Sequence, residues 1–281
     1  MVQIGKKNKL EVVKEVDFGV YLDGGSFGEI LLPKKFLHKD CRPGQLVEVF
    51  IYMDSEDLII ATTQKPFAQV EQFAFLKVVS VTPVGAFLDW GLDKDLLVPF
   101  SEQRERMEEG KAYVVYLYLD SKTDRIVASS RISRFLESGH GDFKEEQETR
   151  LLIWEKTQVG YKAVINGRYE GLIFEEDVFQ PLREGQQVKG YIKKLRDDGK
   201  IDLFLEQPGY KKIGALAERI FSLLQEKGGF LHISNQTEPE TIYRVFGVSK
   251  KNYKKAIGAL YKKRVILIEE DGIRLTGKGT E

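Results

Sequence analysis

Aromatic residues lie close to glycines at three places in the chain, and such rings can stack against other flat rings. Phe18 and Tyr21 lie on either side of Gly19, so both rings can face one side of a bend. A ring on an open protein face holds a nucleobase with about 1–3 kcal/mol, whatever the base. Four more rings are candidates for this contact, although each could equally fill a protein interior: Phe87, Trp90, Tyr161 and Phe174. The rings that lie in long apolar runs, and that we expect to be buried, are Tyr52, Tyr116 and Tyr118.

Positively charged side chains near these rings could hold phosphates. Those nearest the ring candidates are Arg125, Arg131, Lys162 and Lys200. The densest group lies in residues 249–264, SKKNYKKAIGALYKKR, which carry seven basic residues and no acidic one. The lysines that we expect to contact phosphate there are Lys250, Lys251, Lys254, Lys255 and Lys262. Because lysine is a point charge, this segment would hold a phosphate backbone without preferring a base.

The net charge of the 281-residue chain is zero, with 43 basic and 43 acidic residues, but the charge is unevenly distributed. Residues 1–64 carry a net charge of −2, residues 65–134 zero, residues 135–208 −4 and residues 209–281 +6. A basic final quarter suits a polyanionic partner, although a solvated, lysine-rich surface would carry the same charge.

The composition is that of a globular protein, and the expected compartment is the cytosol. Hydrophobic residues make up 42% of the chain, yet no apolar run is long enough to span a membrane. The first residues lack the apolar segment of a secretory signal. The single cysteine, Cys41, cannot form an internal disulfide, and no Cys/His spacing fits a zinc site.

No combination of residues suggests catalysis, so we expect neither an enzyme nor a bound cofactor or metal. The three histidines are far apart in the sequence: His38, His140 and His232. The glycine-rich segment 24–28 lacks the Lys-Ser/Thr pair of a phosphate-binding loop. The acidic segments 197–199 and 269–272 are typical of turns.

The chain contains an internal repeat. With a shift of 66 residues, 13–55 align with 79–121 without a gap, and eleven of the 43 positions are identical. A shift of 75 residues indicates a weaker third copy. Two glycines keep a separation of 25 residues in all three copies: Gly19 and Gly44, Gly85 and Gly110, Gly160 and Gly185. Repeats of this kind indicate one structural unit used several times.

Each copy predicts five short strands, with a short insert after the third. The runs are rich in Val, Ile, Tyr and Phe, and Gly, Asp or Pro bounds them. Five strands in about 65 residues are typical of the OB barrel. We therefore predict three tandem OB barrels, over residues 1–64, 65–134 and, after a linker, 135–208.

The copies resemble the S1-type RNA-binding domain. The family pattern, Phe-Gly-x-Phe-Val, is matched by FGVYL at 18–22, VGAFL at 84–88 and VGYK at 159–162. Pro33, Pro99 and Phe174 occupy the position of the family's histidine. The resemblance implies OB folds, with an aromatic face that binds RNA.

Residues 209–281 predict a winged helix, because helical periodicity replaces strand alternation there. An amphipathic helix should end near Gly228-Gly229, and Thr237 to Glu240 fits a capping box for a second helix. Ser249 should cap a third helix that runs to about Arg264, with Tyr261 on its apolar stripe. Residues 265–268 and 273–275 predict a hairpin. The expected fold class is thus mostly β: three S1-like barrels and an α+β winged helix.

This order of modules resembles the bacterial conserved virulence factor B family over essentially the whole chain. The most specific match is FGVSKK at 246–251, followed by KAIG at 255–258 and LYK at 260–262. The resemblance implies an RNA-binding regulatory protein.

The leading hypothesis is a non-enzymatic protein that binds single-stranded RNA. A DNA-binding transcription regulator is the second, but the third helix offers Asn252 and no arginine before Arg264, and arginine makes the commonest specific base contact. A protein-binding scaffold is the third, supported by the neutral and acidic barrels. A nuclease is a distant fourth, because no residues remain for a catalytic domain.

Overall fold

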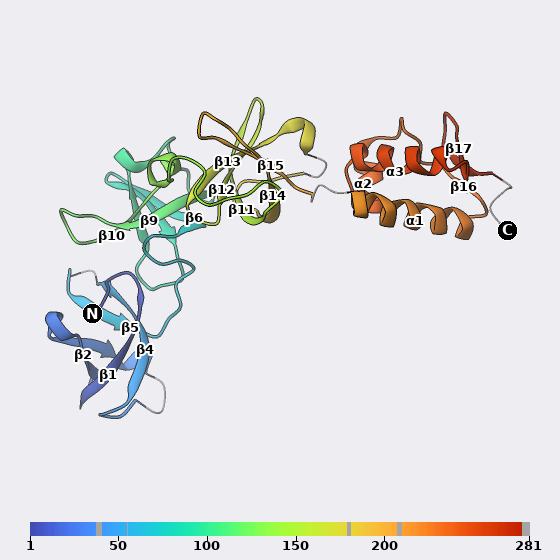
Figure 1. Ribbon diagram of the computed structural model, residues 1–281. Helices are drawn as coiled ribbons and strands as arrows, with labels where there is room; N and C mark the ends of the chain where they lie inside the picture. Colours follow the sequence, from blue (N-terminus) through green and yellow to red (C-terminus); the bar gives the residue numbers. More distant parts are fainter. Residues whose placement is uncertain (38–40, 55, 179–180, 207–209, 277–281) are drawn as a thin grey trace. The chain divides into compact units, whose positions relative to one another are not determined.

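The computed structural model describes residues 1–37, 41–54, 56–178, 181–206 and 210–276, with side chains omitted at 210–213. Three closed five-stranded barrels come first in the chain, and a domain of three helices and a small sheet follows (Figure 1). The predicted fold class is confirmed.

Barrel 1 shows how each repeat closes. Its strands are β1 (Lys7–Val16), β2 (Gly19–Asp23), β3 (Glu29–Pro33), β4 (Leu46–Met53) and β5 (Ile59–Thr62). The strand order is β1-β2-β3-β5-β4, with β3 and β5 parallel and β1 paired with β4. Two short 3-10 helices, η1 (Gly25–Phe27) and η2 (Lys34–Phe36), flank β3. Closure leaves no free sheet edge.

Barrels 2 and 3 repeat this plan. Barrel 2 consists of β6 (Phe73–Thr82), β7 (Gly85–Asp89), β8 (Leu96–Pro99), η3 (Phe100–Glu102), β9 (Ala112–Leu119) and β10 (Ile126–Ser129), followed by η4 (Ile132–Phe135). Barrel 3 consists of β11 (Glu148–Thr157), β12 (Gly160–Ile165), β13 (Tyr169–Phe174), η5 (Glu175–Asp177), β14 (Gln187–Leu195) and β15 (Ile201–Phe204). All three barrels have a bulge at the same place in the first strand.

The paired glycines of the repeat have two physical causes. A Cβ on Gly19, Gly85 or Gly160 would lie 2.0–2.3 Å from a carbonyl oxygen of the facing strand, so no side chain fits there. The second glycine of each pair, 25 residues later, has a φ of +79° to +85° in the turn before the fourth strand. Glycine adopts that conformation without steric cost.

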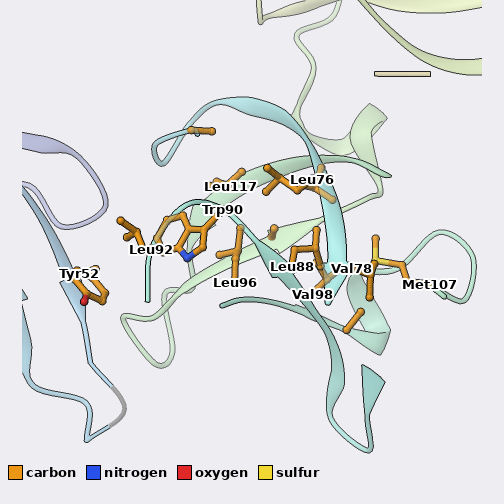
Figure 2. Packing of buried hydrophobic residues seen from close by; sticks show 14 of the residues in the cluster. Tyr52, Leu76, Val78, Leu88, Trp90, Leu92, Leu96, Val98, Met107 and Leu117 are labelled. Atoms are coloured by element: carbon orange, nitrogen blue, oxygen red, sulfur yellow. The ribbon is translucent and has the colours of Figure 1, made fainter. Parts of the chain in front are cut away.

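Barrels 1 and 2 share a hydrophobic core and belong to one compact unit, Met1–Leu136. Phe50 and Tyr52 of β4 pack with Trp90 and Leu92, which follow β7, and the Phe50 and Trp90 ring centroids are 5.6 Å apart. Figure 2 shows Tyr52 in one cluster with Trp90 and Leu92. The prediction that Tyr52 is buried is confirmed. Trp90, a predicted stacking residue, is only 3% exposed and cannot offer its face to a ligand.

Two other tyrosines were predicted to be buried, but they do not lie in a barrel interior. Tyr116 and Tyr118 of β9 are only half-buried and face the ring of Phe135 in η4, at centroid distances of 4.4 and 5.3 Å. The apolar run did not reveal these outward positions. Every second residue of a barrel strand points outward, even when the whole strand is apolar.

The C-terminal domain is a winged helix made of α1 (Tyr210–Glu226), β16 (Phe230–Leu231), α2 (Pro239–Phe246), α3 (Lys250–Lys262), β17 (Ile266–Ile268) and β18 (Ile273–Leu275). The predicted hairpin forms, and β16 adds a third strand to it, in the order β16-β18-β17. The capping box does not form: Glu238 is the N-cap of α2 without a side-chain bond, and the Thr237 hydroxyl accepts from the Ser234 N–H instead. Ser249 caps α3 as predicted, accepting from the Asn252 N–H at 3.2 Å.

Candidate nucleic-acid interface

Barrel 1 presents the predicted ring pair at its surface. Phe18, in the turn between β1 and β2, is 57% exposed, and its ring centroid is 6.3 Å from that of Tyr21 on β2 in an edge-to-face arrangement. The Phe18 carbonyl accepts from the Lys34 N–H at 2.8 Å, which ties the lysines of η2 to the same turn. The Lys14 ammonium lies 4.7 Å from the Tyr21 ring centroid. An exposed aromatic surface is therefore present here, with the Lys14 ammonium beside it, and that ammonium also pairs with Glu29.

Barrel 2 keeps part of this arrangement. Phe87 on β7 is half-buried, and Val84, which is 60% exposed, takes the place of Phe18. Trp90 instead donates its indole N–H to the Lys94 carbonyl, because it belongs to the shared core. Sequence reasoning missed Phe100, whose ring centroid lies 3.9 Å from the Arg106 guanidinium. Its position in the sequence could have indicated it, because Phe100 directly follows Pro99, which pairs with Gly85.

The two predicted arginines of barrel 2 have different surroundings. Arg131 is exposed, and its Nε–H donates to the carbonyl of Ser101 in η3 at 2.8 Å. Arg125 forms an ion pair with Asp57 of barrel 1, and its hydrogen bond lowers the pKa of that carboxyl group. Arg125 therefore contributes to the contact between barrels 1 and 2.

Barrel 3 offers a less open surface. Tyr161 is only 7% exposed and belongs to the barrel core, so the predicted stacking role does not fit its position. The Lys162 ammonium lies 3.1 Å from Glu155, and the exposed Lys200 lies 3.5 Å from Asp198. Phe174 is half-buried, with the Lys193 ammonium 5.4 Å from its ring centroid. Lys162, Lys193 and Lys200 are thus already paired with carboxylates.

The outer face of α3 carries the predicted lysines. Lys251, Lys254, Lys255 and Lys262 are exposed, and none has a carboxylate at ion-pairing distance among the residues that the structure describes. Lys250 is half-buried and donates to the Gln236 carbonyl at 3.2 Å. The lysine face of α3, as we call these four exposed lysines, is therefore positive and open to solvent.

The opposite face of α3 anchors the helix. Tyr253, Ala256, Ile257 and Leu260 are buried against α1 and α2. The Tyr253 hydroxyl donates to the Ile233 carbonyl at 2.7 Å, and burial raises the pKa of this tyrosine. Tyr261, assigned from the sequence to the apolar stripe, is 53% exposed instead.

Two features of the domain oppose the reading of a duplex. Asn252, the side chain on α3 best suited to contact a base, donates its amide to Glu206, which also accepts from the Ser249 N–H at 2.9 Å. The tip of the β17–β18 wing is acidic, and its Arg274 pairs with Glu269 at 2.7 Å. The hydrogen bond from Arg274 lowers the pKa of Glu269.

Within the described ranges, no group of three or more His, Cys, Asp or Glu side chains is arranged to hold a metal ion. The same ranges contain no helix that is long and apolar enough to cross a membrane.

Comparison with known proteins identifies the modules. The S1 domain family matches residues 4–64 and 72–131, which are barrels 1 and 2. The CvfB-like winged helix domain family matches residues 218–275. Barrel 3 has the same strand order as barrels 1 and 2.

Several similar proteins cover almost the whole chain. Conserved virulence factor B of Staphylococcus aureus is 27% identical over 286 residues, 98% of this chain and 95% of its own. The Staphylococcus saprophyticus protein of the same name is 25% identical over 285 residues, with the same coverage. A crystal structure of a multidomain protein with nucleic acid binding domains from Streptococcus pneumoniae covers 97% of this chain and 98% of its own, with 23% identity and a TM-score of 0.42.

S1 and winged helix domains are nucleic-acid-binding modules, and here both types occur in one chain. The chain therefore combines S1 domains with a CvfB-like winged helix domain, and along its length it is similar to proteins named conserved virulence factor B.

Proposed function

We propose that this protein is a cytosolic regulator that binds single-stranded RNA and acts by binding rather than by catalysis. The observation that carries the proposal is the lysine face of α3, whose four ammonium groups have no carboxylate partner among the described residues. The exposed ring pair of barrel 1 is the second support.

The lysine face suits a phosphate backbone for an electrostatic reason. Ammonium groups that already pair with carboxylates, such as Lys162, must give up that partner before they can hold a phosphate. Among the residues that the structure describes, the four lysines of the lysine face have no carboxylate partner to give up. Each phosphate that they neutralise releases condensed counterions, so affinity should fall steeply with salt, with a slope of about −0.7 per phosphate on a single strand.

The ring pair of barrel 1 suits unpaired bases. Phe18 exposes more than half of its surface. A base can therefore cover this apolar ring without displacing any packing inside the protein. Stacking supplies about 1–3 kcal/mol per base and does not depend on base identity. Lys34 follows in η2, where its ammonium group can hold a phosphate beside a stacked base, whereas Lys35 already pairs with Asp93.

A duplex is the second candidate ligand, because a winged helix places one helix in the major groove of many regulators. Here α3 offers lysines without an exposed arginine until Arg264, beyond the helix end, and Asn252 is held by Glu206. The acidic tip of the wing would also lie against phosphates. These features favour a single strand.

The test is fluorescence anisotropy of the full chain with labelled oligo-U, oligo-A and a DNA duplex over a salt series. In the triple variant Lys251→Glu, Lys254→Glu, Lys255→Glu, we expect the affinity for oligo-U to fall at least a hundredfold at low salt, because three attractive charges become repulsive. The salt slope should become shallower by about two, since roughly three phosphate contacts are lost.

The matched control is Lys122→Glu, Lys144→Glu, Lys227→Glu, which makes the same change in net charge at exposed lysines outside α3. It should weaken binding by no more than a few-fold. Equal losses in both triple variants would show that net charge alone attracts RNA. Tighter binding to the duplex would favour a DNA regulator, and no binding to any probe would favour a protein scaffold.

A further inference from the structure

Tyr261 lies on the outside of α3, among the lysines, and not against the core. It is 53% exposed, whereas Ile257, one turn earlier, is 1% exposed. Burial would be the ordinary state of a tyrosine at the border of an amphipathic helix. An aromatic ring exposed within a field of unpaired ammonium groups can stack a base while the lysines hold the flanking phosphates.

Gly258 lies at the centre of this surface. In an α-helix the neighbours of a residue on the surface are those three and four positions away, which for Gly258 are Lys254, Lys255, Tyr261 and Lys262. A Cβ built on Gly258 would have no atom within 4 Å, so neither packing nor a close approach inside the protein requires a glycine here. The residue is helical, and its φ is not positive.

A glycine inside a helix destabilises it by about 1 kcal/mol relative to alanine. At Gly258 no packing contact within the domain offsets this loss of stability. It leaves a bare patch of helix backbone beside the Tyr261 ring, bounded by lysines at both ends. Such a patch lets a flat ligand approach the helix closely.

We propose that Tyr261 and Gly258 form a notch that receives one unpaired base of single-stranded RNA, stacked on the Tyr261 ring, with its phosphates held by Lys254, Lys255 and Lys262. The proposal rests on the proposed function and assigns the α3 surface a preference for single strands. The bases of a duplex have both faces covered by their neighbours and cannot enter the notch.

The first test replaces the ring. In the full chain, Tyr261→Leu should lower the affinity for labelled oligo-U about tenfold, whereas Tyr261→Phe should bind like the wild type. Stacking involves no counterion release, so the tenfold loss should be the same at every salt concentration. Affinity for a duplex of the same length should not change.

The second test fills the notch. Gly258→Leu should weaken oligo-U binding at least fivefold while its thermal unfolding temperature stays equal or rises, because leucine favours a helix. The matched control is Gly214→Leu, at an exposed glycine of α1 that also has nothing within 4 Å of its missing Cβ. This variant should gain the same stability and keep full affinity.

Wild-type affinity in either Tyr261→Leu or Gly258→Leu overturns the notch. The result also separates the two proposals. If both variants bind normally while the α3 triple-lysine variant does not, α3 holds phosphates only and the proposed function stands. If the triple-lysine variant binds normally too, the proposed function fails with the notch.

Discussion

At the scale of the residue, Phe18 is the most exposed of the predicted stacking rings. We expect Phe18→Ala to lower the affinity for oligo-U five- to a hundredfold, as the loss of one stacked base would. The unfolding temperature should hardly change, because the side chain is not part of the barrel core. Phe67→Ala is the control, since Phe67 is 66% exposed outside the strands of the barrels and should not affect binding. Titration by anisotropy and a melting curve decide the matter, and a stability loss without an affinity loss would assign Phe18 to the fold.

At the scale of the element, the repeat glycines allow neighbouring barrel strands to approach closely. A Cβ at Gly85 would lie 2.3 Å from the Val98 carbonyl oxygen, an atom fixed in the neighbouring strand. We expect Gly85→Ala to destabilise the protein by about 3 kcal/mol or more, because backbone must move. Gly110→Ala changes a glycine with a φ of +81° and open space around it, so only the strain of a left-handed residue applies, about 1–2 kcal/mol. Urea unfolding compares the two, and equal losses would contradict the steric explanation.

At the scale of the molecule, barrels 1 and 2 form one unit because aromatic side chains from both meet in a single core. Trp90→Ala should destabilise this unit by about 3–5 kcal/mol, the usual result of removing a large buried ring. Both barrels should then unfold together at a lower temperature, as seen by calorimetry, while the winged helix keeps its own transition. Loss of cooperativity in barrel 2 alone would show that the shared core does not couple the two barrels.

Much of the architecture could be predicted because it is encoded locally. The strands, the repeat of glycines and the cap at Ser249 follow from short-range rules of backbone conformation, which act wherever the same residues recur. The lysine face of α3 was predictable for the same reason, since a helix of known period places each residue on a face.

The fate of individual rings was decided only by the tertiary structure. Phe18 lies beside Gly19 and Trp90 beside Gly91 in the sequence. Trp90 is buried because the other barrel packs on it, whereas none of the residues that the structure describes covers Phe18 in this way. Tyr261 likewise lies at the edge of the apolar stripe of α3. There, a small rotation of the helix about its axis decides whether the side chain is buried or exposed. Local pattern determines which face a residue joins, but burial depends on what packs against that face, and distant parts of the chain supply it.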